Sequence, residues 1–181
     1  MNWANVRLLV TDFDGVWTDD AVYTDQHGNE SVRCLRADGY GITRLQAAGV
    51  PVIVLSAEVN PVVAARCRKL NVMAFQGLDG SIESKLDVLE KLTAARTVQL
   101  SEVAYMGNDV NDIECLQAVG FPIVVQNAWR AVFDVWWPSS SHPIGSGRRP
   151  SDAGTPYVTS RAGGYGAVRE VCDLILEARN G

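Results

Sequence analysis

With 181 residues, 47% of them hydrophobic and 20% charged, the chain has the balance of one folded domain over residues 1–181 and not of a disordered protein. Its net charge of −5 at pH 7 argues against nucleic acid as a partner, because phosphate backbones are bound by clustered Lys and Arg. No apolar run approaches the roughly 18 to 20 residues of a membrane span, and the dispersed cysteines favour reduced thiols, so we expect a cytoplasmic protein without a membrane partner.

Short runs of β-forming apolar residues alternate along the chain with segments of helical periodicity. The runs cover residues 6–10, 51–55, 72–75, 103–106 and 122–125. Apolar side chains recur three and four positions apart in the segments 41–49, 61–70, 85–92 and 111–119. This alternation predicts an α/β fold, a Rossmann-like parallel sheet with helices on both faces.

Residues 21–34 depart from this alternation. Two alternating runs flank the turn-forming cluster DQHGN there. Such a cluster between alternating runs is typical of a β-hairpin. We therefore expect a hairpin that projects after the first strand.

Polar residues follow three of the predicted strands at the point where each strand ends, and a lysine opens a predicted helix. These residues are Asp12 and Asp14, Ser56, Asp109 and Asp112, and Lys85. Ligands bind at the carboxyl ends of parallel strands, so the side chains should converge there. Carboxylates hold Mg²⁺ while leaving sites for water and a substrate phosphate, and a hydroxyl and a lysine can stabilise phosphoryl oxygens. The set predicts phosphoryl transfer.

The motifs DFDGVWTD (residues 12–19), LSAE (55–58), Lys85 and GNDVND (107–112) resemble, in order, the four motifs of haloacid dehalogenase superfamily phosphatases. The likeness is greatest to the branch that includes the phosphatases of 3-deoxy-manno-octulosonate 8-phosphate and of nonulosonate (acylneuraminate) 9-phosphates. It extends to ADGYGITRLQAAGV and to the tail YVTSRAGGYGAVREVCDLIL. The resemblance implies a Mg²⁺-dependent phosphatase for a small sugar-acid phosphate, without a separate cap domain.

The resemblance also implies roles for the carboxylates. Asp12 would be the nucleophile that forms an aspartyl-phosphate, and Asp14 would be the general acid and base. Mg²⁺ would lie on the Asp12 carboxylate, the Asp14 carbonyl and the Asp109 carboxylate. Asp19 and Asp20 are interpreted as turn residues; the family commonly has glycine at position 20, and Asp tolerates a positive φ better than most residues.

Three further residues complete the implied catalytic site. Ser56 and Lys85 would bind the phosphate. Asp112 would hold Lys85 or a metal-bound water from behind. The alternatives for the first two are a helix N-cap and an exposed helix charge.

Two residues bear on the substrate. The octulosonate phosphatases usually have Thr-Gly-Arg where this chain has Ser-Ala-Glu, and Glu58 with Lys69 resembles the nonulosonate enzymes. Glu58 would bond sugar hydroxyls and Lys69 the sugar carboxylate. The alternative is that Glu58 is a first-turn helix residue and Lys69 a solvated charge.

Closure of the site is expected from other subunits, because the intervals between motifs cannot hold a cap domain. In the resembling branch a homotetramer closes the site through its hairpins and glycine-rich tails. Here the tail offers Arg161 and Arg169 as candidate substrate-binding groups, and its glycines would let it enter a narrow interface.

Residues 134–156 depart from the branch. They are rich in Pro, Gly and Ser and lack periodicity, which predicts a flexible loop. Two other functions stay open: a non-catalytic oligomerisation module related to acylneuraminate cytidylyltransferase domains, and a phosphatase of another small metabolite.

Overall fold

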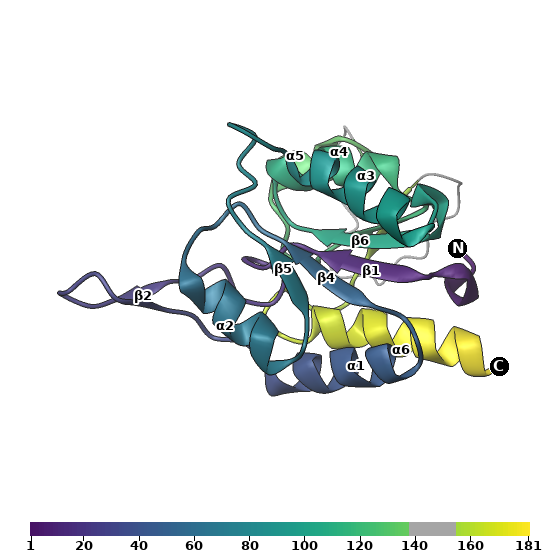
Figure 1. The fold of residues 1–181 in the computed structure, drawn as a ribbon, viewed down its shortest axis with the longest axis horizontal. Helices are drawn as coiled ribbons and strands as arrows, with labels where there is room; N and C mark the ends of the chain where they lie inside the picture. Colours follow the sequence, from purple (N-terminus) through teal and green to yellow (C-terminus); the bar gives the residue numbers. More distant parts are fainter. Residues whose placement is uncertain (138–154) are drawn as a thin grey trace.

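The computed structural model describes residues 1–137 and 155–181. Six strands form one parallel sheet in the order β5-β4-β1-β6-β7-β8 (Figure 1). They are β1 (Leu8–Thr11), β4 (Val52–Leu55), β5 (Met73–Phe75), β6 (Val103–Gly107), β7 (Phe121–Val124) and β8 (Tyr157–Val158). All five predicted strands are present. The two-residue edge strand β8 was not predicted.

Helices cover both faces of the sheet, as predicted. They are α1 (Arg36–Ala47), α2 (Pro61–Lys69), α3 (Lys85–Arg96), α4 (Ile113–Ala118), α5 (Arg130–Asp134) and α6 (Ala167–Asn180), with single 3₁₀ turns at Trp3–Asn5, Leu100–Glu102 and Val110–Asp112. Apolar residues of α1, α2 and α6 form one core cluster and those of α3, α4 and α5 the other. Figure 1 shows α1 and α6 on one side of the sheet and α3, α4 and α5 on the opposite side. The fold is therefore the predicted Rossmann-like α/β fold.

The central strand β1 explains why its sequence is a continuous apolar run. Leu9 packs into the cluster with α1, α2 and α6, whereas Leu8 and Val10 pack into the other one. Side chains alternate between the faces of a strand, so a strand covered on both sides buries every residue. Because β1 pairs with both β4 and β6, the residues that follow these three strands meet at one edge.

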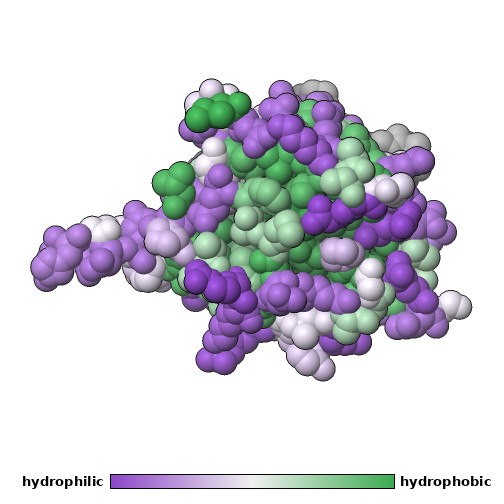
Figure 2. All heavy atoms as spheres, viewed as in Figure 1, coloured by the Kyte–Doolittle hydropathy of each residue, from purple (hydrophilic) through white to green (hydrophobic). Residues whose placement is uncertain are grey.

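The hairpin predicted at residues 21–34 is present. Its strands β2 (Tyr23–Thr24) and β3 (Glu30–Ser31) are antiparallel, and it projects from the body of the molecule with a mostly hydrophilic surface (Figures 1 and 2). The Asp25 carboxylate closes the turn by accepting hydrogen bonds from the backbone N–H groups of His27 and Asn29 at 2.8 and 3.0 Å. A two-stranded hairpin of this size is only marginally stable alone in water.

The predicted flexible loop at residues 134–156 lies mostly outside the described residues, which exclude 138–154. Its described beginning is ordered by packing. Asp134 ends α5, and Trp136 and Trp137 pack against the core cluster that includes Phe133. Within the described ranges 1–137 and 155–181, no helix has the length and apolar character needed to cross a bilayer.

A buried carboxylate joins α1 to the start of α6. Asp38 is 2% exposed, and its Oδ1 accepts a hydrogen bond from the backbone N–H of Arg169 at 2.8 Å. It therefore caps α6 in place of Gly166, whose N-cap position carries no side chain. Burial raises the pKa of Asp38 to about 6.

This pKa predicts a pH-dependent stability. Because the folded protein holds the Asp38 proton more tightly than the unfolded chain, the group's contribution to the free energy of unfolding falls as pH rises from about 4 to about 6. The matched variant is Asp38→Asn, which keeps an acceptor for the Arg169 N–H and cannot ionise. Between about pH 4 and pH 7 we expect the free energy of unfolding of the parent to fall by up to about 3 kcal/mol relative to that of the variant. Urea denaturation at both pH values measures the difference. Identical pH dependence in the two proteins would contradict the assignment.

Candidate active site

A cavity of about 430 Å³ opens at the carboxyl ends of β1, β4 and β6. Ser56 lines it together with six acidic residues: Asp12, Asp14, Asp20, Glu58, Asp79 and Asp109. The register of the three strands brings the first and last of the predicted motifs to one place, as expected from strand ends at a common edge. The lining is strongly negative, so an anionic phosphate requires a cation to enter it.

Lys85 lies beneath this cavity between two carboxylates. Its Nζ is 2.8 Å from Asp12 Oδ2 and 2.8 Å from Asp112 Oδ1, and its side chain is 1% exposed. Lys85 is the first residue of α3, where a capping box between Ser84 and Asp87 fixes the start of the helix. The side chain is therefore a buried part of the site and not an exposed helix charge, which excludes the alternative considered above.

Asp112 lies on the side of Lys85 opposite Asp12 and binds its ammonium. This is one of the two roles expected for Asp112, the other being a contact to a metal-bound water. Asp112 is fully buried, and it also accepts hydrogen bonds from the Tyr105 hydroxyl at 2.7 Å and from the Asn108 backbone N–H at 2.9 Å. Both oxygens of the Asp112 carboxylate therefore accept hydrogen bonds from protein groups. Charge-assisted bonds of this kind fix the position of the ammonium under Asp12.

Burial and charge act in opposite directions on the titrating groups of this cluster. Burial raises the pKa of Asp12, the Asp112 charge raises it further, and Lys85 lowers it; the net direction is upward. Burial lowers the pKa of Lys85, but the charges of the two carboxylates outweigh burial and raise it. One ammonium between two carboxylates leaves a residual negative charge at Asp12 that a divalent cation can offset.

The residues expected to hold Mg²⁺ fit a hard cation. The Asp12 and Asp109 carboxylates and the Asn108 side chain line the same cavity, and Asn108 Oδ1 is buried without a hydrogen-bond partner in the described structure. Within the described ranges, no three His, Cys, Asp or Glu side chains are grouped around one point. The expected ligand set needs only two carboxylates and the Asp14 carbonyl, with water completing the oxygen ligands.

The loop after β1 places Asp14 beside Asp12. The Thr18 hydroxyl donates a hydrogen bond to Asp14 Oδ1 at 3.2 Å, and burial raises the pKa of Asp14, which favours a role as a proton donor. Gly15 has φ +73°, and a Cβ there would lie 2.0 Å from Asn108 Nδ2. Asp20 has φ 66°, the left-handed conformation expected at a position where the family commonly has glycine.

Glu58 lies in the cavity but also stabilises its own loop. Its carboxylate accepts hydrogen bonds from the backbone N–H groups of Val59 and Asn60 at 2.6 and 2.9 Å, and its own N–H donates to Ser56 Oγ at 3.1 Å. Helix α2 begins only at Pro61, so the alternative of a first-turn helix residue is wrong. Ser56 is 1% exposed and lines the cavity. Because Asn60 is the N-cap of α2, the alternative of a helix N-cap at Ser56 is wrong.

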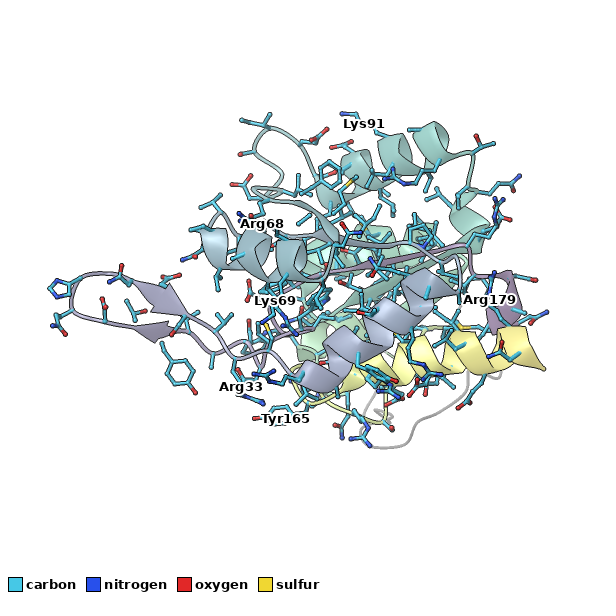
Figure 3. All side chains as sticks on the ribbon, turned by 60° about the horizontal axis from the view of Figure 1, so that its bottom comes forward. Arg33, Arg68, Lys69, Lys91, Tyr165 and Arg179 are labelled. Atoms are coloured by element: carbon cyan, nitrogen blue, oxygen red, sulfur yellow. The ribbon has the colours of Figure 1, made fainter. Side chains whose placement is uncertain are left out.

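The remaining predicted residues lie elsewhere in the chain. Lys69 is the last residue of α2 (Figure 3). It lines a second cavity with Arg36 and Arg66. Arg161 and Arg169 line a third cavity between α1 and α6, where Arg169 Nε is 2.6 Å from Asp173 Oδ2. One copy of the chain therefore does not bring these three cations to Asp12.

The glycine-rich tail packs against its own chain, and its expected role at a subunit interface stays a prediction. The Gly163 N–H donates to Asn127 Oδ1 at 2.7 Å and the Gly164 N–H to the Val16 carbonyl at 3.1 Å. A Cβ at Gly163 would lie 1.7 Å from the Gly15 carbonyl oxygen. The glycines are needed because the tail lies directly on the loop that carries Asp14.

Arg33, which was not predicted from the sequence, connects the base of the hairpin to this tail. It pairs with Asp19 at 3.2 Å, donates to the Gly164 carbonyl at 3.2 Å, and lies 4.4 Å from the ring centre of Tyr165 (Figure 3). No sequence pattern marks these partners, because they are far apart in the chain and belong to no periodic segment.

Known proteins resemble this chain in sequence and in fold. Residues 82–135 match a family model described as haloacid dehalogenase-like hydrolase. The 3-deoxy-D-manno-octulosonate 8-phosphate phosphatase of Salmonella typhi is 34% identical over 176 residues, which cover 97% of this chain and 81% of that protein. The chain therefore belongs to the haloacid dehalogenase-like hydrolases. It is an enzyme of the phosphoric monoester hydrolase class.

Solved structures agree with this assignment. The phosphatase of the same name from Yersinia pestis superposes with a TM-score of 0.81 at 32% identity, covering 99% of this chain and 85% of that one. The one from Moraxella catarrhalis, solved in complex with magnesium, phosphate and KDO, superposes with a TM-score of 0.82 at 29% identity, covering 99% and 90%. The resemblance and the fold inferred from the sequence are confirmed.

Proposed function

We propose that this chain hydrolyses the phosphate ester of a sugar acid, of the octulosonate 8-phosphate or nonulosonate 9-phosphate type, through an aspartyl-phosphate on Asp12. The observation that carries the proposal is the cavity in which Asp12, Asp14, Ser56 and Asp109 meet above Lys85. Its relatives named as octulosonate 8-phosphate phosphatases support the class of substrate.

In the first step, an oxygen of the Asp12 carboxylate attacks phosphorus. A P–O bond to Asp12 forms, the P–O bond to the sugar breaks, and Asp14 gives its proton to the departing sugar oxygen. Ser56 and Lys85 stabilise the negative charge on the transferring phosphoryl group. In the second step water attacks phosphorus, Asp14 takes its proton, and inorganic phosphate leaves the regenerated Asp12 carboxylate.

Mg²⁺ is the cofactor of this reaction. The Asp12 and Asp109 carboxylates and the Asp14 carbonyl would hold it, and it supplies charge neutralisation between the carboxylates and the phosphate. The acidic lining of the cavity makes this neutralisation necessary, because Lys85 already pairs with two carboxylates.

An assay of phosphate release tests the proposed function. The substrates are an octulosonate 8-phosphate, a nonulosonate 9-phosphate and two hexose 6-phosphates, each with Mg²⁺ and with excess EDTA. We expect release from a sugar-acid phosphate, dependent on Mg²⁺ and faster than from either hexose phosphate. Faster release from a hexose phosphate would show that the proposed substrate class is wrong. No phosphate release from any of the four substrates would favour the non-catalytic oligomerisation module.

Glu58 is the proposed contact to the sugar hydroxyls, because it is an acidic residue at the cavity beside the phosphate site. We expect Glu58→Arg to lower kcat/KM for a nonulosonate 9-phosphate by about tenfold and to affect p-nitrophenyl phosphate much less, since only the former loses a partner. Glu58→Gln is the matched control for the loop, because it keeps an acceptor for the Val59 and Asn60 N–H groups. Equal losses on both substrates would indicate a damaged phosphate site instead.

The proposed assembly is a homotetramer of this single domain, in the cytoplasm. The projecting hairpin supports it, since a hairpin of this size needs a covering surface. In such an assembly Lys69, Arg161 and Arg169, which lie outside the Asp12 cavity of their own chain, would act in a neighbouring site as contacts for the substrate anion.

The double change Arg161→Ala and Arg169→Ala tests this assembly. We expect a tetramer by light scattering, with KM for the sugar-acid phosphate raised about tenfold in the variant because two cations near the anion are lost. Arg68→Ala, an exposed arginine of α2, is the control (Figure 3). A fully active monomer with an unchanged KM in the double variant would refute the proposal.

A further inference from the structure

Trp129 differs from the other tryptophans of the chain. Its side chain is 59% exposed, whereas Trp17 is 1% exposed and the other three pack against the core clusters. A single exposed apolar side chain needs no special explanation by itself, so the position of Trp129 beside the cavity decides its meaning.

Trp129 lies next to two residues of the Asp12 cavity. Its backbone N–H donates to the Asn108 carbonyl at 2.9 Å, and its side chain lies within reach of the Asp20 carboxylate. Asn108 and Asp20 both line the cavity. The indole N–H is the only donor of a tryptophan side chain and a carboxylate accepts, so Asp20 is a suitable partner for the ring.

Asp20 is a turn residue, whose backbone N–H donates to Thr18 Oγ1 at 3.2 Å, and its side chain lies beside Trp129. Its backbone has φ 66°, a conformation in which glycine is less strained, and its carboxylate lies partly buried near the charge of Asp109. Asp20 thus places the Trp129 side chain beside a residue that lines the cavity.

We propose that Trp129, beside Asp20, is a specificity-determining residue whose ring packs against the carbon skeleton of the sugar. The proposal rests on the proposed function, because it needs a substrate whose non-phosphate part is large enough to reach the rim. An aromatic face suits a ring of C–H groups, and its rigid side chain loses little conformational freedom on binding.

Kinetics with a large and a small substrate test the role. With Trp129→Ala we expect KM to rise about tenfold for the sugar-acid phosphate that the parent hydrolyses fastest, equivalent to about 1.4 kcal/mol. With acetyl phosphate, which has no sugar, KM and kcat should stay within about twofold of the parent. Trp129→Phe keeps an apolar ring and loses the indole N–H, so its KM should lie between those of the parent and of Trp129→Ala.

Controls separate this role from a structural one. Ile82→Ala removes an apolar side chain that is 98% exposed in the loop before α3, and it should change neither substrate's kinetics. Equal losses of Trp129→Ala on both substrates, or no change on either, would overturn the proposal. So would a change of oligomer size by light scattering, which would make Trp129 an interface residue.

Failure of the proposed function gives a different result. If the parent hydrolyses hexose phosphates and no sugar-acid phosphate, the substrate class is wrong. The comparison of Trp129→Ala with the parent is then made on the hexose phosphate, where a selective rise in KM still supports the packing role and its absence refutes it.

Discussion

Asp12→Asn is expected to lower kcat for every phosphate ester by roughly four orders of magnitude or more, the scale seen when a catalytic nucleophile is removed. The amide has nearly the same shape as the carboxylate, and its oxygen can still accept a hydrogen bond from Phe13 or Lys85. It lacks the negative charge and electron density needed to attack phosphorus. Phosphate release under saturating Mg²⁺ measures the loss.

The control for this change is a carboxylate in the same cavity. Asp79 lines it but hydrogen-bonds only within its own loop, to Ser81, among the contacts seen in the described residues. Asp79→Asn should therefore retain turnover close to that of the parent. Turnover of Asp12→Asn within about tenfold of the parent, in a protein with an unchanged circular dichroism spectrum, would remove Asp12 from its role.

Lys85→Met is expected to have the largest effect on stability. The change leaves Asp12 and Asp112 buried and facing each other without the ammonium that separates them at 2.8 Å from each. Breaking a buried ion pair by removing one partner costs about 3–5 kcal/mol, because an uncompensated charge remains in a low-dielectric site. Urea denaturation without Mg²⁺ should show this fall in the free energy of unfolding, together with loss of phosphatase activity.

Lys91→Met is the matched control, since Lys91 lies on the same helix with its ammonium in solvent near Glu83 (Figure 3). Its stability should be close to that of the parent. If the two variants unfold at the same urea concentration, the buried cluster does not stabilise the fold as described.

The parallel sheet could be predicted because its central strands β1, β4 and β6 are buried on both faces. Leu8, Leu9 and Val10 form a continuous apolar run for that reason, and such runs stand out from the helical segments between them. Helix α1 begins at Arg36, five residues before the predicted segment, because residues 36–40 carry no apolar periodicity and its start is held by Asp38 and α6. Strand β8, with only two residues, leaves no period to detect.

The catalytic part of the site could be predicted for a similar reason. Residues that follow neighbouring parallel strands meet at one edge of the sheet. The proximity of Asp12, Ser56 and Asp109 therefore follows from the strand order. The position of Lys69 relative to Asp12 depends on the length and direction of α2, which no local pattern encodes. Trp129 gave no signal either, since a single aromatic residue in a loop has no periodicity, and its partner Asp20 is remote in sequence.

Covalent capture of the phosphoryl group tests the central proposal most directly. The parent enzyme, turning over the sugar-acid phosphate that it hydrolyses fastest in the presence of Mg²⁺, is quenched in acid and its peptides are analysed by mass spectrometry. The predicted result is one added phosphoryl group on the peptide that contains Asp12, absent from Asp12→Asn and from samples with EDTA. A phosphoryl group on a different residue, or sustained turnover in Asp12→Asn, would contradict the account.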